Sequence, residues 1–176
     1  MNLTKNDLTS LIPLGAVDCN LNNISFKDEA ISYLSNLLFS CGMIQSEREF
    51  QRAVLERERL GETLLNNMLA IPHAVSGCVI SPGMAFGLSQ EGILYGGKST
   101  SEYAKAIFLM ALPKNKKKYR KELEVLKRIT CLFLDPIFNE CLLAISNYEE
   151  LINLVRETLV KHTDIRFPVN APAERR

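Results

Sequence analysis

The chain has 176 residues, of which 47% are hydrophobic and 23% are charged. That length and apolar content fit one domain with its own core, because domains commonly run to about 100–150 residues. The 21 basic and 20 acidic residues leave a formal net charge of +1, so no long-range field favours nucleic acid or a membrane as partner.

The cysteines and the N-terminus predict a cytoplasmic protein with reduced thiols and no cofactor. The cysteines are odd in number, irregularly spaced and without a Cys-x-x-Cys pair, which indicates neither a disulfide framework nor a zinc site. They are Cys19, Cys41, Cys78, Cys131 and Cys141. The N-terminus lacks a basic-then-apolar signal sequence, and no run reaches the ~18–20 apolar residues that span a bilayer.

The first helix is predicted after an N-terminal segment, residues 1–22, that is polar and rich in turns. That segment has a possible edge strand over residues 15–21. From Ser25 an acidic start is followed by apolar residues at helical spacing, and the pattern stops at Gly42. The apolar residues are Ile31, Leu34, Leu37, Leu38 and Cys41. This spacing predicts an amphipathic helix.

A second helix is predicted from Ser46 to about Leu60. Ser46 followed three residues later by Glu49 has the form of a capping box, which typically opens a helix. Arg57 then lies near the C-terminal end of this helix and faces whatever follows the turn at Gly61. An arginine there can come back in space to residues that follow the turn.

The middle of the chain contains short apolar runs separated by turn residues, a pattern that predicts strands. The runs cover residues 79–80, 84–88, 92–95 and 106–112. The last of them is the longest and wholly apolar. We therefore expect it to be buried and central in the sheet.

Two polar motifs flank this last predicted strand. Gly96-Gly97-Lys98-Ser99 resembles a phosphate-binding loop only superficially, because it lacks the earlier glycine and does not open a helix. The basic run over residues 114–121 is interpreted as a solvated approach to a helix. Its functional alternative is contact with an acidic partner surface or, less favoured, with nucleic acid.

The C-terminal third is predicted to hold two helices. Helical spacing of apolar residues predicts one over residues 121–133, ended by Asp135-Pro136, and a short segment over residues 137–146 leads to the other. The apolar face of the last helix is Leu151, Leu154, Val155 and Leu159. His162 is interpreted as a surface or helix-end residue, and residues 166–176 as a disordered tail.

The candidate reactive group is His73, which follows Pro72 in the run Ala70-Ile71-Pro72-His73-Ala74. Imidazole is neutral and nucleophilic near pH 7, since its unperturbed pKa is about 6.5. Proline fixes its own φ and biases the preceding residue toward extended backbone, so we expect His73 at the end of a strand or on a stiff turn. The alternative is a structural histidine with one ring nitrogen bound to a carbonyl.

The residues before His73 extend this motif. Five features stand in one ungapped register: Arg57-Glu58, Thr63, Leu65, Asn67 and Ala70-Ile71-Pro72-His73. The pattern resembles the signature of the fructose/mannitol-type (type 2) enzyme IIA domains of the bacterial phosphoenolpyruvate-dependent sugar phosphotransferase system, over about residues 23–162. The resemblance implies an α/β fold: one domain over residues 23–165, with a mixed parallel and antiparallel central sheet flanked by helices on both faces. Helices before and after the predicted strands favour the same architecture.

The resemblance also implies roles for three residues. His73 is expected to be transiently phosphorylated, and Arg57 to lie near the phosphoryl group. A phosphoryl group in transfer spreads negative charge over its oxygens and needs fixed donors, of which a guanidinium supplies two. Thr63 is a supporting residue whose hydroxyl, with backbone N–H groups near His73, is expected to complete the anion site.

Two departures from the family pattern lie close to this chemistry. Asn66 and Met68 stand where the family usually has glycines, so we expect the loop under His73 to differ in shape. Glu122 stands where many members carry a second histidine. A carboxylate there repels a phosphohistidine unless it turns outward or pairs with a nearby lysine.

The implied function is that of a phosphocarrier, a phosphotransferase with a phosphohistidine intermediate. His73 would take the group from the histidine-containing phosphocarrier protein and pass it to a IIB component for sugar uptake, meeting the membrane only through the permease. One alternative is an enzyme IIA-like regulatory module whose phosphorylation state controls binding to a transcriptional or metabolic partner. Another is an unrelated domain in which His73 is structural, buried and bound at both nitrogens.

Overall fold

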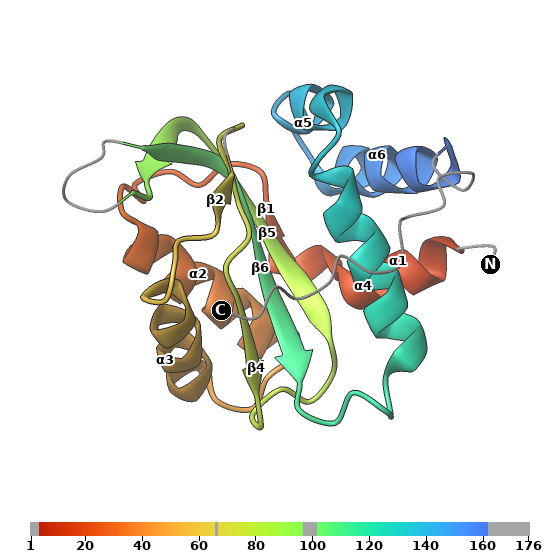
Figure 1. Ribbon diagram of the computed structural model, residues 1–176. Helices are drawn as coiled ribbons and strands as arrows, with labels where there is room; N and C mark the ends of the chain where they lie inside the picture. The colour runs from red at the N-terminus through yellow and green to blue at the C-terminus, as the bar shows by residue number, and fades with distance from the viewer. Residues whose placement is uncertain (1–3, 66, 97–101, 162–176) are drawn as a thin grey trace, which may run out of the picture.

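A mixed sheet of six strands forms the centre of the computed structural model, which describes residues 4–65, 67–96 and 102–161 (Figure 1). The strand order is β1-β5-β6-β3-β2, and β4 also pairs with β6. The strands are β1 (Val17–Asp18), β2 (Leu64–Leu65), β3 (Leu69–Ala70), β4 (His73–Ser76), β5 (Gly83–Leu94) and β6 (Tyr103–Pro113). His162, the expected tail and the Gly97-Lys98-Ser99 motif lie outside the described residues.

The central strand is β6, as the long apolar run predicted. It pairs antiparallel with β5 and parallel with both β3 and β4. Successive side chains of a strand point to opposite faces, so an apolar run can fill two cores at once. Ala106, Phe108 and Met110 belong to one buried cluster, and Ile107 and Leu109 belong to the other.

Helices cover both faces of the sheet (Figure 1). One face carries α2 (Lys27–Ser40) and α3 (Glu47–Glu58), and the other carries α1 (Lys5–Leu11), α4 (Arg120–Leu132), α5 (Pro136–Leu142) and α6 (Tyr148–Lys161). A short 3-10 helix, η1, spans Leu14–Ala16. This arrangement confirms the predicted α/β domain with helices on both faces.

Four helices fall where periodicity predicted them, namely α2, α3, α4 and α6. The Ser46 side chain accepts a hydrogen bond from the Glu49 N–H and so caps α3, as expected. The segment over residues 137–146 was expected only as a connection, but it contains α5. Asp135 caps α5 and Pro136 occupies its first turn, two features that favour a helix start and that the sequence analysis used only as a stop.

The strand predictions need two corrections. The runs at 84–88 and 92–95 are one strand, β5, with an irregular register between Leu88 and Ile93. Gly92 has a φ of 86° there, which lets the strand bend and continue instead of turning back. Residues 79–80 are not a strand, since Val79 forms only an isolated bridge with Ile44.

The N-terminal segment was expected to be irregular apart from an edge strand. The strand is present as β1, which pairs with β5 at the edge of the sheet. The segment also contains α1, which the sequence analysis missed. Leu8, Leu11 and Ile12 are at most 2% exposed and belong to the cluster under α4 to α6. A helix of seven residues shows too few apolar repeats to be recognised from spacing alone.

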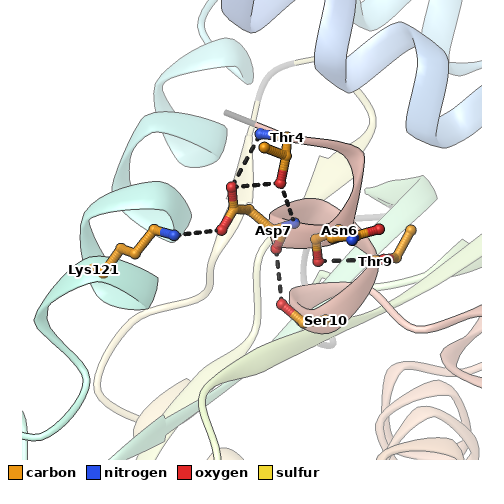
Figure 2. Close-up of polar contacts among 6 residues, drawn as sticks. All are labelled: Thr4, Asn6, Asp7, Thr9, Ser10 and Lys121. Atoms are coloured by element: carbon orange, nitrogen blue, oxygen red, sulfur yellow. Dashed lines mark hydrogen bonds and ion pairs between the residues drawn. The ribbon is translucent and has the colours of Figure 1, made fainter. Parts of the chain in front are cut away.

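Both carboxylate oxygens of Asp7 accept hydrogen bonds that hold α1 in place (Figure 2). Oδ2 accepts from the Thr4 N–H at 3.0 Å within a capping box, and Oδ1 accepts from Lys121 Nζ of α4 at 2.6 Å. The hydrogen bond from Lys121, followed by those from Thr4, lowers the pKa of Asp7 from 3.8 to about 2. Asp7 therefore ties the first helix to the fourth while it is ionised.

We expect Asp7→Asn to lower the thermal unfolding midpoint at pH 7 by a few degrees or less. Because the pKa of Asp7 is lowered by folding, its contribution is present above about pH 4 and is lost as the pH falls toward 2. The gap between variant and wild type should close over that interval in scanning calorimetry. A gap that stays constant down to pH 2 would contradict the proposed contacts. Lys121→Met is the matched variant and should show the same pH dependence.

Candidate functional site

His73 is the first residue of β4 and lies at a break between two short strands. Ala70 of β3 pairs with Ile107, and His73 of β4 pairs with Met110, so both strands run beside β6. Pro72 has no N–H and interrupts the run between them, although its carbonyl accepts from the Met110 N–H at 2.9 Å. The prediction that His73 lies at the end of a strand is confirmed.

The two partners of the imidazole assign its tautomer. Nδ1 lies 2.9 Å from the Ile71 carbonyl oxygen, which can only accept, so Nδ1 carries the proton. Nε2 lies 3.3 Å from Arg57 Nε, which can only donate, so Nε2 holds the lone pair. The ring is neutral in this arrangement. Its nucleophilic atom is Nε2, and the nearest cation is already beside it.

Arg57 reaches His73 from the last turn of α3, as its place before the turn at Gly61 predicted. Its Nη1 donates to the Gly61 carbonyl at 2.8 Å, which orients the guanidinium plane. Both Arg57 and His73 are half-buried. The contact from Nδ1 to a carbonyl is the one expected of a structural histidine, and both ring nitrogens are engaged. The ring is only half-buried, however, which distinguishes it from the buried histidine of the unrelated-domain alternative.

Thr63 does not lie against His73, because its hydroxyl is engaged elsewhere. Thr63 Oγ1 donates to Glu58 Oε1 at 2.7 Å and lies 3.3 Å from the Tyr95 hydroxyl. The connection to His73 is indirect, through the Thr63 carbonyl, which accepts from the Ile71 N–H at 3.0 Å. The sequence analysis expected the hydroxyl to donate to an anion, whereas the described structure directs it toward a buried carboxylate.

Glu58 and Tyr95 belong to this site and were not predicted to do so. Glu58 is 4% exposed and Tyr95 is fully buried. Burial and then the nearby Glu58 charge raise the pKa of Tyr95, so its hydroxyl stays protonated next to Thr63 and Glu58. The spacing of Phe50, Val54 and Glu58 placed Glu58 on the buried face of α3, a pattern that could have revealed it.

Met68 adopts the left-handed backbone conformation that glycine favours, with a φ of 60°. Its carbonyl accepts from the N–H groups of Lys105 and Ala106, which fixes the turn to β6. The turn therefore forms with methionine in place, at the cost of strain on a residue with a Cβ. Asn66, the other departure from glycine, lies outside the described residues.

Glu122 lies in the first turn of α4 and is half-buried. Neither a hydrogen bond nor an ion pair joins its side chain to another described residue. Its charge contributes, well after the Asp7 contacts, to the raised pKa of Lys121. A carboxylate in the first turn of a helix is favoured by the helix dipole, which accounts for its place without a contact to His73.

Neither a metal centre nor a membrane helix is found in the part of the chain that the structure describes. No group of three or more histidine, cysteine or acidic side chains there could hold a metal ion. None of the described helices is long and apolar enough to cross a membrane.

Fold and site together define an α/β domain that presents a nucleophilic imidazole nitrogen beside a guanidinium, at a break in the sheet. The chain belongs to the family of the phosphoenolpyruvate-dependent sugar phosphotransferase system, EIIA 2, whose model matches residues 11–158. The resemblance inferred from the run that ends at His73 is thereby confirmed.

Three comparisons place the chain within this family and fold. It is 25% identical over 150 residues to the fructose-specific EIIABC component of Bacillus subtilis, covering 85% of this chain and 23% of that one. The chain thus spans about a quarter of this relative. IIA-Ntr, the nitrogen regulatory protein of Neisseria meningitidis, superposes with a TM-score of 0.70 at 23% identity, covering 83% and 97% of the two chains. Enzyme IIAMTL in its complex with phosphorylated enzyme IIBMTL from Escherichia coli gives 0.65 at 24% identity, covering 84% and 99%.

We expect Met68→Gly to raise the free energy of unfolding by about 0.5–1 kcal/mol. Relief of left-handed strain is worth about 1–2 kcal/mol, and the extra chain entropy of glycine offsets part of it. Little packing is lost, because Met68 is 42% exposed. Urea unfolding measures the change.

Asn23→Gly is the matched control for Met68→Gly. Asn23 has a φ of 63°, and asparagine tolerates that conformation well. Its replacement should change stability less than that of Met68. Equal effects at both positions would show that strain at Met68 is not the cause.

Proposed function

We propose that the chain is a phosphocarrier of a sugar phosphotransferase system, with His73 as the phosphoryl acceptor. His73 takes the group from the histidine-containing phosphocarrier protein and passes it to a cysteine of a IIB component in the cytoplasm. The observation that carries the proposal is the unprotonated Nε2 of His73 lying 3.3 Å from Arg57 Nε. A nucleophile and a fixed donor for the incoming oxygens are the two groups that phosphoryl transfer needs.

The geometry supports a specific sequence of events. The Nε2 lone pair attacks phosphorus in line while the bond from phosphorus to the donor's histidine nitrogen breaks. The ring becomes cationic as the Nε2–P bond forms, and the Nδ1–H bond to the Ile71 carbonyl stabilises that charge. Arg57 turns its N–H groups from Nε2 to the phosphoryl oxygens, while the Gly61 carbonyl keeps the guanidinium nearby.

Onward transfer reverses these steps. A thiolate of the IIB component attacks phosphorus, the Nε2–P bond breaks, and the electron pair returns to Nε2, so the ring is neutral again. Family membership and the solved complex of enzyme IIAMTL with phosphorylated enzyme IIBMTL support a IIB component as acceptor. The role of the histidine-containing phosphocarrier protein as donor is inferred from the family pattern in the sequence.

A second candidate function is a regulatory module whose phosphorylation at His73 changes its affinity for a transcriptional or metabolic partner. Glu122 at the family's second-histidine position favours it, because a carboxylate cannot donate to a phosphoryl group at neutral pH. The fold is also similar to that of the nitrogen regulatory protein IIA-Ntr. Mixing the phosphorylated protein with a purified mannitol-specific IIB domain separates the two functions, because a carrier loses its phosphoryl group to the IIB cysteine and a switch retains it.

We expect incubation with phosphoenolpyruvate, enzyme I and the phosphocarrier protein to add one acid-labile phosphoryl group. Intact mass spectrometry measures the gain, and His73→Ala should abolish it. Because Nδ1 carries the proton, NMR of the product should show the phosphoryl group on Nε2. A wild-type protein that stays unmodified, under conditions that phosphorylate a known IIA domain, would overturn the proposal.

We expect Arg57→Ala to slow phosphorylation of His73 by about 10²–10³-fold, the usual effect of removing one fixed donor from a transition state. Rapid quench of the labelled protein measures the rate. Arg52→Ala is the matched control, since Arg52 lies on the same helix with its side chain 73% exposed and paired only with Glu56. Equal rates for the two variants would exclude a role for Arg57 in the transfer.

A further inference from the structure

We propose that Glu58 is a positioning residue for His73, whose buried carboxylate fixes the acceptor of the imidazole Nδ1 through the turn that follows α3, while its main-chain carbonyl holds the start of the same turn. The kinetic consequence rests on the proposed function of His73, whereas the structural consequence does not. The chemistry of transfer does not require Glu58 to contact the phosphoryl group. Glu58 is connected to His73 through hydrogen bonds of intervening residues.

The first connection runs from Glu58 to Nδ1. The carboxylate of Glu58 accepts twice from Thr63, at 2.7 Å from its Oγ1 and at 3.3 Å from its N–H. The Thr63 carbonyl accepts from the Ile71 N–H at 3.0 Å. The Ile71 carbonyl in turn accepts from Nδ1 of His73 at 2.9 Å. The position of the one acceptor available to Nδ1 is thus set by Glu58.

The second connection runs to Nε2. The Glu58 carbonyl accepts from the Gly61 N–H at 3.2 Å, and the Gly61 carbonyl accepts from Arg57 Nη1 at 2.8 Å. Arg57 Nε then donates to Nε2. Gly61 lies two residues before Thr63, so the same short turn carries both connections. This second connection starts from the main-chain carbonyl of Glu58 and therefore persists without the carboxylate. If the carboxylate releases Thr63, the acceptor of Nδ1 is the group that is free to move.

Burial strengthens the hydrogen bonds between the Glu58 carboxylate and Thr63. Glu58 is 4% exposed, and hydrogen bonds to a charged group strengthen where water is excluded. Within the described residues Glu58 has no ion pair, so neighbouring hydrogen-bond donors compensate its charge, Thr63 first among them. The buried Tyr95 hydroxyl lies 3.3 Å from Thr63 Oγ1, and its hydrogen bond to the Glu58 carboxylate contributes to the raised pKa of Tyr95.

Lys27 packs beside the group formed by Glu58, Thr63 and Tyr95. Its Nζ lies 5.2 Å from the centroid of the Tyr95 ring and 2.8 Å from Glu62 Oε1. Tyr95 follows β5, Lys27 begins α2 and Glu58 ends α3. The ends of α3 and β5 therefore meet at Thr63, and Lys27 of α2 packs on Tyr95 beside them. A buried carboxylate is costly to fold, and the hydrogen bonds of Glu58 lead through Thr63 and Ile71 to His73.

The test uses Glu58→Met, which removes the carboxylate at similar volume, and Thr63→Val, which removes only the hydroxyl. In wild type, two-bond ¹H–¹⁵N spectra should show His73 protonated at Nδ1 alone. In both variants we expect a mixture of the two tautomers. With the phosphocarrier protein as donor, kcat should fall by roughly 10–100-fold in Glu58→Met, because small misplacements of reacting groups have effects of that size. KM should change less than about twofold, since the docking surface is untouched.

Two controls separate positioning from stability. Ser35→Ala removes another buried hydroxyl, which donates to the Ile31 carbonyl within α2 at 2.6 Å, and should leave tautomer and kcat as in wild type. Thr63→Ser restores the donor to Glu58 and should recover most of the rate lost in Thr63→Val. If Glu58→Met does not fold, the tautomer and kcat of Thr63→Val and Thr63→Ser decide whether the carboxylate positions His73.

Wild-type tautomer and kcat in folded Glu58→Met and Thr63→Val would overturn the proposal and leave Glu58 a purely structural residue. Failure of the proposed function gives a different result. In that case the wild-type protein is not phosphorylated, but the ¹⁵N shifts of His73 still report whether Glu58 orients the ring.

Discussion

The pairing of an interrupted strand with β6 is the constraint on which the site depends. Pro72 cannot donate to a ladder, so the chain leaves strand geometry between β3 and β4 and returns at His73. The interruption frees the Ile71 carbonyl to accept from the imidazole instead of from a neighbouring strand. Because β6 is buried on both faces and held on both sides, the two short strands are fixed although each is too short to be stable alone.

The two faces of the sheet serve different purposes. The face under α4, α5 and α6 holds the aromatic stack of Phe86, Phe108 and Phe133, with ring centroids 4.7 Å apart in each adjacent pair. The face under α2 and α3 carries the polar groups of the site. Both faces bury an apolar core, and the second face also buries the Glu58 carboxylate, whose cost in stability is offset by apolar burial on both sides of the sheet.

The departures from the family pattern bear on function in different ways. Met68 keeps a left-handed turn under strain, so it affects stability more than chemistry. In the family pattern inferred from the sequence, Glu122 places an acceptor where many members have a donor, and Arg57 is the cation in contact with His73. Under the proposed function, Arg57 and backbone N–H groups would compensate the charge of a phosphohistidine, and the orientation of Arg57 would matter more than it would with a second donor.

The sequence by itself determined the features that depend on residues close together in the chain. Helical spacing located α2, α3, α4 and α6, and the apolar run located β6, because these patterns depend on neighbours close in the chain. The Pro72-His73 step and the ungapped register back to Arg57 indicated the candidate reactive pair. The structure added how the turn at Gly61 brings those two residues together.

Only the tertiary structure decided the features that depend on contacts distant in the chain. The seven residues of α1 are stable as a helix because Asp7 meets Lys121 and Leu8 meets the core. β5 continues past its polar residues 89–91 because β6 pairs with it on both sides of that irregularity, at Leu88 and at Ile93. Tyr95 reaches the site from the end of β5. The tautomer of His73 follows from the positions of the Ile71 carbonyl and the Arg57 guanidinium. Such contacts form only after the chain has closed large loops, so no local pattern records them.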